Sequence, residues 1–491
     1  MPALHGKYSK VLLGLTPWPP RLRRGEEIVS GGHPQPPDGN SRSLHLPGFS
    51  CKAPYARVLY VVPYPLPLAH LPAGPYSRAY RVNTAVKECT VATQKFDFSK
   101  LIADRVPPGA PARPVVRPKY DFGTGFPDPD SFPWQGLHEA LGRALKDKGR
   151  DLVLYPDPQG HPEVRQFIAD KLKRERNITV NPDQVLVTGG SGPAIALFVQ
   201  LLSNPGDVLL TEDYTYVGTL GIMRNLKARI VGVATDAEGM RPDALEQAIK
   251  DLARFEVKPK MVYTIPSFQN PLGTDMGVAR RKAILAVAQK YSIPIYEDDA
   301  YEDLRFAGAR SPAIHSYDDS GMVLYSGTFS KILGPAMRVG FLVAPQELMP
   351  RINSMYWGRP TSEFATLAAL YYLRDHLDDH VDEINGILRT RRDAMLGAIG
   401  EYLGSAATVS HPDGGLYLWL GLPEGKNVAA VADKARARGV AYLPGPSFSP
   451  SGGGQNYLRL CFGYERPDAI REGIAAMAEV FAQNGLLDKK R

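Results

Sequence analysis

The sequence has few cysteines and no long apolar run. Its 491 residues include three cysteines, Cys51, Cys89 and Cys461, at wide and odd spacing. Neither a disulfide framework nor a zinc site has this pattern, so we expect a reducing, cytoplasmic environment and no metal. No stretch approaches the roughly 20 apolar residues that cross a bilayer, so we expect no transmembrane helix and no membrane partner.

The chain also lacks an excess of charge outside its first segment. Residues 1–90 contain 11 Lys and Arg against four Asp and Glu, which equals the whole net charge of +7. The rest of the chain is neutral overall, so its charge gives no reason to expect nucleic-acid binding. A content of 44% hydrophobic and 22% charged residues is typical of a globular protein, and the length suits two or three domains.

Residues 1–90 hold 14 of the 44 prolines. Proline removes backbone donors and breaks helices, so we expect disorder or loose coil there. A targeting segment is a weaker interpretation, because acids follow the Arg21–Arg24 cluster at once and no apolar region of the right length comes after it. Our hypothesis is that the physiological protein begins near Val91 and that residues 1–90 reflect a mis-assigned start, which intact mass from the native host would test.

From residue 184 onward, apolar strands alternate with helices. We predict strands at 185–188, 208–211, 229–234, 261–265, 293–297, 322–325 and 339–343, and helices at 194–202, 243–252 and 278–289. This alternation predicts an α/β fold with a mostly parallel sheet sandwiched by helices. Beyond residue 360, a long helical region cut by Gly386 and Gly397 and then short strands predict a smaller α+β domain. We expect a leader (1–90), an arm (91–135), a large domain (136–355) and a small domain (356–491).

Polar residues follow several of these strands, where sheets of this type bind ligands. They include Tyr214 to Tyr216, Asn270, Asp298 and Tyr301. The glycine turn 189–192 leads into a helix, and the free N–H groups and positive dipole of a helix N-terminus favour phosphate.

The stretch Ser326 to Lys331 delivers a lysine from a strand end between hydroxyl residues. Alone, such a lysine is more often a solvated loop residue. Here the hydroxyls of Thr328 and Ser330 and the guanidinium of Arg338 suit a phosphate, and the amine suits an imine with a carbonyl cofactor. A lysine beside a phosphate site suggests pyridoxal phosphate.

The ordered set of motifs resembles the fold-type I pyridoxal-phosphate enzymes, class I/II aminotransferases, and within them the 2-aminoadipate and kynurenine aminotransferases. The resemblance covers residue 119 to the C-terminus. It implies transfer of an amino group from an L-amino acid to a 2-oxo acid, with 2-oxoglutarate as the expected acceptor. It further implies ping-pong chemistry through a Lys331 aldimine in a homodimer with shared active sites.

The resemblance also implies residue roles. Lys331 is the catalytic residue that holds the cofactor and moves the α-proton. Asp298 pairs with the pyridinium nitrogen, and Tyr216 stacks on the ring. Asn270 and Tyr301 bind the ring oxygen. Residues implied at the phosphate are Ser191, Gly192, Thr328, Ser330, Arg338 and, from the neighbouring subunit, Tyr155. Residues implied at the substrate are Arg459, which clamps the α-carboxylate, Gly125 of a closing loop, and Asn270.

Two features depart from that pattern or leave it open. Gly192-Pro193 replaces a polar residue after the phosphate-loop serine, which puts one phosphate contact in doubt. No further arginine is assigned to a substrate side chain, although Phe126 and Trp134 are compatible with a hydrophobic one.

Other functions fit parts of the same pattern. The sensor domain of MocR-type transcriptional regulators shares the stretches 155–161 and 266–273, but residues 1–90 are too broken by proline to form the DNA-binding module that precedes it. A lyase, decarboxylase or synthase on this scaffold is a third possibility, because one fold hosts many chemistries.

Overall fold

The computed structural model describes residues 96–103, 106, 109 and 117–487. The predictions for residues 1–90 lie outside this part of the chain, as does most of the arm before residue 117. No helix within the described residues is long and apolar enough to cross a membrane.

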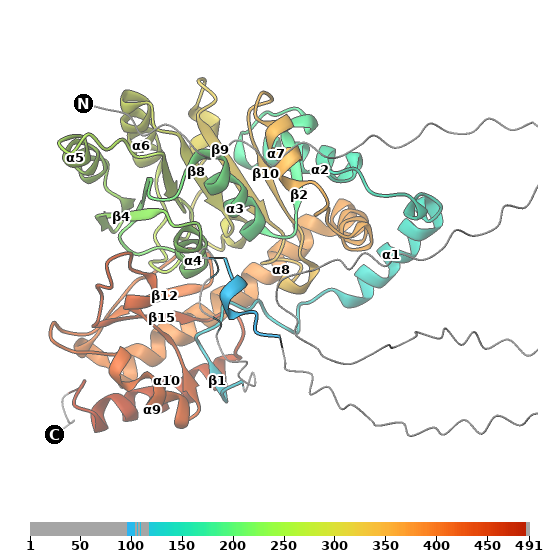
Figure 1. Cartoon of the computed structure of the whole chain (residues 1–491). Helices are drawn as coiled ribbons and strands as arrows, with labels where there is room; N and C mark the ends of the chain where they lie inside the picture. The colour runs from blue at the N-terminus through green and yellow to red at the C-terminus, as the bar shows by residue number, and fades with distance from the viewer. Residues whose placement is uncertain (1–95, 104–105, 107–108, 110–116, 488–491) are drawn as a thin grey trace, which may run out of the picture. The chain divides into compact units, whose positions relative to one another are not determined.

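A seven-stranded sheet forms the centre of the described region (Figure 1). Its strands, in spatial order, are β2 (Val185–Thr188), β10 (Gly340–Val343), β9 (Val323–Thr328), β8 (Ile295–Asp299), β7 (Met261–Thr264), β3 (Val208–Glu212) and β4 (Arg229–Val233). Strand β10 runs antiparallel to both of its neighbours, and the other pairs are parallel. The predicted α/β fold with a mostly parallel sheet is confirmed.

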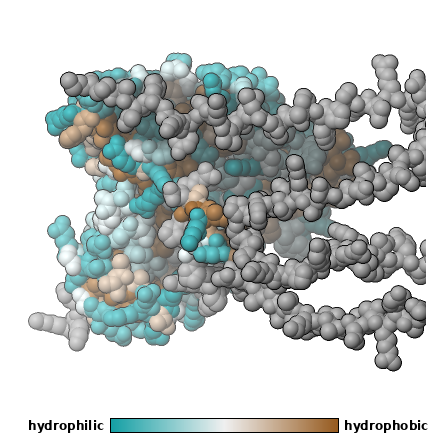
Figure 2. Space-filling view, in the orientation of Figure 1, coloured by the Kyte–Doolittle hydropathy of each residue, from teal (hydrophilic) through white to brown (hydrophobic). Residues whose placement is uncertain are grey.

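Most strands of the sheet are buried on both faces, which explains their many apolar side chains, whereas the edge strand β4 is partly exposed and β8 ends in three acidic residues. In β3, Leu209 packs in one core cluster with α3 (Ser191–Leu202), whereas Leu210 packs in a second cluster with α5 (Pro242–Ala253) and α6 (Val278–Tyr291). Successive side chains of a strand point to opposite faces. Figure 1 shows α5 and α6 together beyond β4, and in Figure 2 the outer surface of that region is largely hydrophilic.

A smaller α+β region follows in the chain. Its four-stranded sheet has the order β11 (Thr408–Val409), β12 (Tyr417–Gly421), β15 (Tyr457–Cys461) and β14 (Leu443–Pro444). The helices α9 (Ala432–Ala437) and α10 (Pro467–Gln483) lie beside it. Strand β1 (Tyr120–Asp121) pairs in parallel with β13 (Val440–Ala441), so the chain just before the Gly123–Gly125 loop is fixed to this region.

The long helix α8 (Glu363–Tyr402) contacts α1 (Trp134–Lys148), α2 (Pro162–Arg176) and α10. We predicted that Gly386 and Gly397 cut this segment, but the helix runs through both. Each glycine costs about 1 kcal/mol in a helix interior. A buried face that includes Leu367, Leu388 and Met395 offsets that cost.

The other α-helices of the described region are α4 (Val217–Asn225) and α7 (Met349–Tyr356), and β5 (Thr235–Asp236) pairs with β6 (Gly239–Met240).

Candidate active site

A cavity of about 450 Å³ lies where β8 and β9 end, bordered by the N-terminal ends of α3 and α4 and by the small sheet. Parallel sheets bind ligands at these carboxyl ends. Predicted site residues that line the cavity are Gly125, Ser191, Gly192, Tyr216, Asp298, Tyr301, Thr328, Ser330, Lys331, Arg338 and Arg459. Segments more than 300 residues apart in the sequence thus contribute to one chamber.

Three residues named from the sequence lie elsewhere. Asn270 is fully buried and does not line the cavity, but it contacts two residues that do. Tyr155 is fully exposed, at 101%, and lies outside this cavity. Trp134 is also exposed and is not part of the cavity, whereas Phe126 lines it. Trp134 therefore does not contribute to this cavity within the described residues.

Lys331 projects into the cavity from the turn after β9. Its Nζ donates to the carbonyl oxygen of Gly125 at 3.1 Å. The next residue is fixed from behind, because the Nε2 of the buried His380 lies 2.7 Å from the carbonyl oxygen of Ile332. Burial lowers the pKa of Lys331 from 10.5 to about 8. A substantial fraction of the amine is therefore neutral, and hence nucleophilic, just above neutral pH.

Asp298 lies at the end of β8 and is almost completely buried. The Tyr263 hydroxyl donates to its Oδ2 at 2.6 Å, and the Ser326 hydroxyl lies 3.4 Å from its Oδ1. Burial raises the pKa of this carboxyl from 3.8 to about 6, and the hydrogen bond from Tyr263 opposes the shift. A cationic N–H placed beside Asp298 would favour its ionised form.

Arg459 extends from β15 and is buried at the opposite wall. Its Nη1 donates to Oδ1 of Asn270 at 2.9 Å, and its Nη2 donates to the carbonyl oxygen of Gly123. The guanidinium carbon lies 4.2 Å from the centre of the Tyr417 ring. Its buried Nε has no hydrogen-bond partner among the described residues. A charged donor held in place with one free N–H suits a carboxylate ligand.

The remaining end of the cavity suits a phosphate. Ser191 and Gly192 form the first turn of α3, one turn earlier than the helix start we predicted. Pro193 is tolerated in that turn because the first N–H groups of a helix have no intrahelical acceptor. Gly190 has φ +90°, and a Cβ there would lie 2.5 Å from Nη2 of Arg338. The glycine turn thus allows the guanidinium to approach the helix N-terminus.

Two tyrosines were missed by the sequence analysis. Tyr417 lines the cavity, and its hydroxyl lies 3.3 Å from that of Tyr301. A Cβ on Gly125 would lie 2.1 Å from the Tyr417 hydroxyl, so this contact requires glycine at position 125. Tyr263 lies in the middle of an apolar strand, a position that predicts an ordinary core residue. No local signal identifies either one, although Tyr417 follows the Gly414-Gly415 pair, where the chain approaches Phe268 closely.

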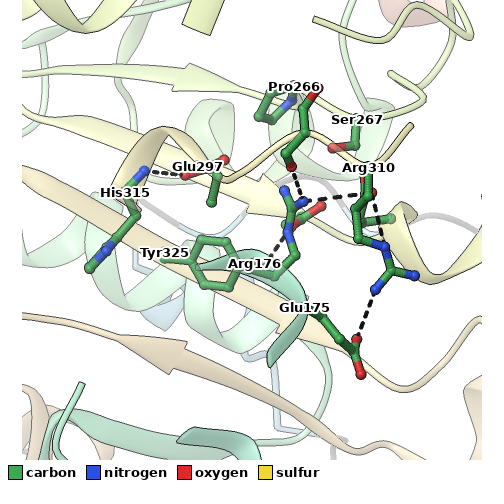
Figure 3. Close-up of polar contacts among 12 residues, drawn as sticks. Glu175, Arg176, Pro266, Ser267, Glu297, Arg310, His315 and Tyr325 are labelled. Atoms are coloured by element: carbon green, nitrogen blue, oxygen red, sulfur yellow. Dashed lines mark hydrogen bonds and ion pairs between the residues drawn. The ribbon is translucent and has the colours of Figure 1, made fainter. Parts of the chain in front are cut away.

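A buried ionic network supports β8 beneath the cavity (Figure 3). Arg176 donates through Nε to Oδ2 of Asp299 at 2.6 Å, and the Tyr325 hydroxyl donates to the same oxygen at 2.7 Å. Figure 3 shows Arg176 beside the Tyr325 ring and Arg310 extended toward Glu175, with Nη1 and Oε2 3.4 Å apart. Because Asp299 follows Asp298 directly, this network anchors the strand end that carries the cavity carboxylate.

The side chains that line this cavity fit pyridoxal phosphate. A weakly basic lysine amine, a buried carboxylate with a raised pKa and an arginine at a helix N-terminus match the aldehyde, ring nitrogen and phosphate of that cofactor. The free Nε of Arg459 leaves a donor for a second, carboxylate-bearing ligand.

Comparison with known proteins identifies the family. The sequence pattern of "Aminotransferase class I and II" matches residues 117–476. The aromatic-amino-acid aminotransferase 1 of Thermococcus litoralis is 34% identical over 73% of this chain and 87% of its own length. The HTH-type transcriptional regulator YisV of Bacillus subtilis is 30% identical over 73% of this chain and 72% of its own.

A solved structure extends the likeness to the fold. The α-aminoadipate aminotransferase of Thermus thermophilus, in complex with N-(5'-phosphopyridoxyl)-L-leucine, superposes with a TM-score of 0.69 at 30% identity, over 74% of this chain and 92% of its own. The chain therefore belongs to the class I and II aminotransferases, which are pyridoxal-phosphate-dependent enzymes.

Proposed function

We propose that the cavity around Lys331 is where this aminotransferase moves an amino group from an L-amino acid to a 2-oxo acid, with 2-oxoglutarate as the acceptor. The observation that carries the proposal is the joint presence of three groups in one cavity. These are the Lys331 amine with a pKa of about 8, the buried Asp298 and the partly unpaired guanidinium of Arg459.

When bound, pyridoxal phosphate supplies the electron sink for bond breaking at the amino acid's α-carbon. Lys331 would be the base that takes the proton from that carbon and the acid that returns it. A pKa of about 8 suits both roles, because the neutral and the protonated amine are then both populated near neutral pH. Transfer by ping-pong requires this reversal in each half of the cycle.

Asp298 and Tyr301 would set the electronic state of the ring. Asp298 would pair with the ring nitrogen and favour its cationic form, which is the form that accepts electrons. Tyr301 would donate its hydroxyl to the ring oxygen, and Nδ2 of Asn270 donates to that hydroxyl at 3.0 Å. Tyr216, at the start of α4, would stack on the ring and set the plane against which the scissile bond stands.

Arg459 orients the substrate. With Nη1 and Nη2 already engaged by Asn270 and Gly123, the guanidinium does not have to be ordered when a carboxylate arrives. Such preorganisation lowers the entropic cost of binding. Ser191, Gly192, Thr328, Ser330 and Arg338 hold the phosphate at the opposite end.

We also propose a homodimer with shared sites, located in the cytoplasm. Apolar side chains are exposed near Tyr155, including Leu154 and Trp357, the latter at 74%. Trp357 borders a surface hollow together with Asp157, which is two residues from Tyr155 in the chain. Contact with a second copy would cover it and present Tyr155 to the partner's phosphate. The buried free thiol of Cys461 is compatible with a reducing compartment.

The experiment is a half-reaction with the purified holoenzyme. Single L-amino acids are added without any acceptor, and release of the matching 2-oxo acid is measured in wild type and in Lys331→Ala. We expect stoichiometric oxo acid from wild type and a loss of about 100- to 10,000-fold in rate in the variant, because that is what a general acid–base contributes. Oxo acid release at the wild-type rate by Lys331→Ala would refute the assignment.

A second candidate function is a transcriptional regulator's sensor, which the similarity to YisV favours. The segment before residue 96 lies outside the described residues. A gel-shift with DNA from upstream of the gene distinguishes the two, because a sensor gives DNA binding without turnover.

A further inference from the structure

The wall of the cavity that comes from the small α+β region contains an unused cation, Arg436. It lies in the last turn of α9, is exposed, and lines the cavity with Ala441, Tyr442 and Leu443. Leu443 pairs in register with Arg459 across β14 and β15, and α9 contacts β13, so both arginines come from the side of the small α+β region that lines the cavity. The phosphate end of the cavity is built from different elements.

Arg436 differs from the other cations of the cavity in having no partner. Lys331 donates to Gly125, Arg338 donates to Gly189, and Arg459 donates to Asn270 and Gly123. The guanidinium of Arg436 has no hydrogen bond or ion pair with any residue that the structure describes. A free guanidinium at a ligand cavity offers two parallel N–H donors to one carboxylate.

The acids that line the same cavity within the described residues are engaged elsewhere. Asp121 accepts hydrogen bonds on Oδ1 from the backbone N–H groups of Gly123 and Thr124 at 3.0 and 3.1 Å, and on Oδ2 from the Thr124 hydroxyl. Asp298 is held by Tyr263 deep in the sheet. The charge of Arg436 is thus left for a ligand.

We propose that Arg436 binds the distal carboxylate of a dicarboxylic substrate, while Arg459 binds its α-carboxylate. This inference rests on the proposed function of the cavity and adds the residue that selects the substrate class. Two cations on one wall match the two carboxylates of an acidic amino acid or a dicarboxylic 2-oxo acid. A monocarboxylic substrate of equal length has no group for Arg436 to bind, so the Arg436 guanidinium stays hydrated and adds nothing to the binding free energy.

The test compares two acceptors that differ only in that carboxylate, 2-oxoglutarate and 2-oxopentanoate. We expect Arg436→Gln to lower kcat/KM for 2-oxoglutarate by about 10- to 100-fold, since a hydrogen bond to a charged group is worth that much, and to leave the value for 2-oxopentanoate within about twofold. Arg438→Gln is the matched control. Arg438 is also an exposed cation and follows the last residue of α9, but it pairs with Glu479 and does not line the cavity.

Binding gives a second measurement that does not depend on turnover. Calorimetric titration of the holoenzyme with glutarate and with pentanoate should show tighter binding of glutarate in wild type and Arg438→Gln, and equal binding of both in Arg436→Gln. An unchanged preference in Arg436→Gln, or an equal loss for both acceptors, would overturn the inference while the proposed function stands. Absence of transamination by wild type with either acceptor would instead contradict the proposed function.

Discussion

At the scale of single residues, burial moves two titrating groups of the cavity in opposite directions. It lowers the pKa of Lys331 to about 8 and raises the pKa of Asp298 to about 6. In both cases water is withdrawn from the charged form. Pairs of groups whose pKa values are shifted toward neutrality are typical of sites that perform acid and base chemistry.

Asp298→Asn should stabilise the cofactor-free protein at neutral pH. The native carboxyl has a pKa of about 6 against an ordinary value of 3.8, so between these values the native state binds more protons than the unfolded chain. Stability of wild type therefore falls as pH rises through this window, and the Asn variant has no such loss. We expect the Tm of the variant to exceed that of wild type above pH 6 and the difference to shrink toward pH 4.

The exposed Asp319→Asn is the control for that measurement, and its Tm difference from wild type should be small at every pH. A Tm advantage of Asp298→Asn that is constant from pH 4 to pH 8 would contradict the link to ionisation.

Gly125→Ala should damage catalysis through Tyr417. The added Cβ would lie 2.1 Å from the tyrosine hydroxyl, so the loop or the ring must shift. Overpacking of this kind costs about 1–3 kcal/mol, which as a rise in activation free energy corresponds to a loss of about 5- to 150-fold in kcat/KM. Tyr417→Phe removes the clashing oxygen. Gly125→Ala should therefore lower kcat/KM less in the Tyr417→Phe background than in wild type. Strictly multiplicative losses would show that the two positions do not interact.

Most of the cavity residues that could be predicted from the sequence lie in short ordered motifs, and Arg459, which stands alone in a strand, was assigned through the family resemblance. Asp298 with Tyr301 and Ser330 with Lys331 keep fixed spacing within one turn or strand end, so a local pattern suffices to predict them. Tyr417 and Arg436 line the same cavity as the Gly123–Gly125 loop, which lies some 300 residues earlier in the sequence. Side-chain contacts across such a separation have no signal in a single sequence.

At the scale of elements, strand positions were predicted better than their ends. The strand predicted to end at 325 extends to Thr328, and the strand predicted from 293 begins at Ile295 and runs through Asp299. The polar residues at these strand ends are typical of loops. In the structure, Asp298 pairs with Ser326 and Asp299 pairs with Gly327, so the pairing of β8 with β9 continues through them. Tertiary pairing therefore decides where the strands end.

Arg176→Met should destabilise the protein strongly. It would leave Asp299 and Glu302 buried without this cation, and removal of one partner from a buried ion pair costs about 3–5 kcal/mol. Arg310→Met removes a half-buried cation with longer contacts to Glu175 and Glu302, and should cost less than about 1 kcal/mol. Urea unfolding of both cofactor-free variants measures the difference. Equal destabilisation would show that the Arg176 network is not a support of β8.

At the scale of the whole molecule, the sequence predicts the α/β class and the presence of a second region, because alternation of strand and helix ends near residue 360. It does not predict how the two regions close one cavity. The pairing of β1 with β13 and the contacts of α8 join them, and both depend on residues far apart in the chain. The division into domains at residues 135 and 355 stays a prediction.

Disruption of the proposed homodimer should also remove activity. Trp357→Asp places a charge in the exposed apolar surface near Tyr155, whereas Phe255→Asp changes a side chain of similar exposure, 78%, just beyond α5. Light scattering should give a dimer for wild type and Phe255→Asp and a monomer with little activity for Trp357→Asp. A fully active monomer would contradict the shared site and the role of Tyr155.

Reductive trapping identifies the lysine that carries the cofactor, which we propose is Lys331. The holoenzyme is reduced with borohydride, digested, and mapped by mass spectrometry for a lysine that bears a pyridoxyl group. We expect one modified lysine, Lys331, and no modification in Lys331→Ala. A pyridoxyl group on a different lysine, or a pyridoxyl yield unchanged by Lys331→Ala, would contradict it.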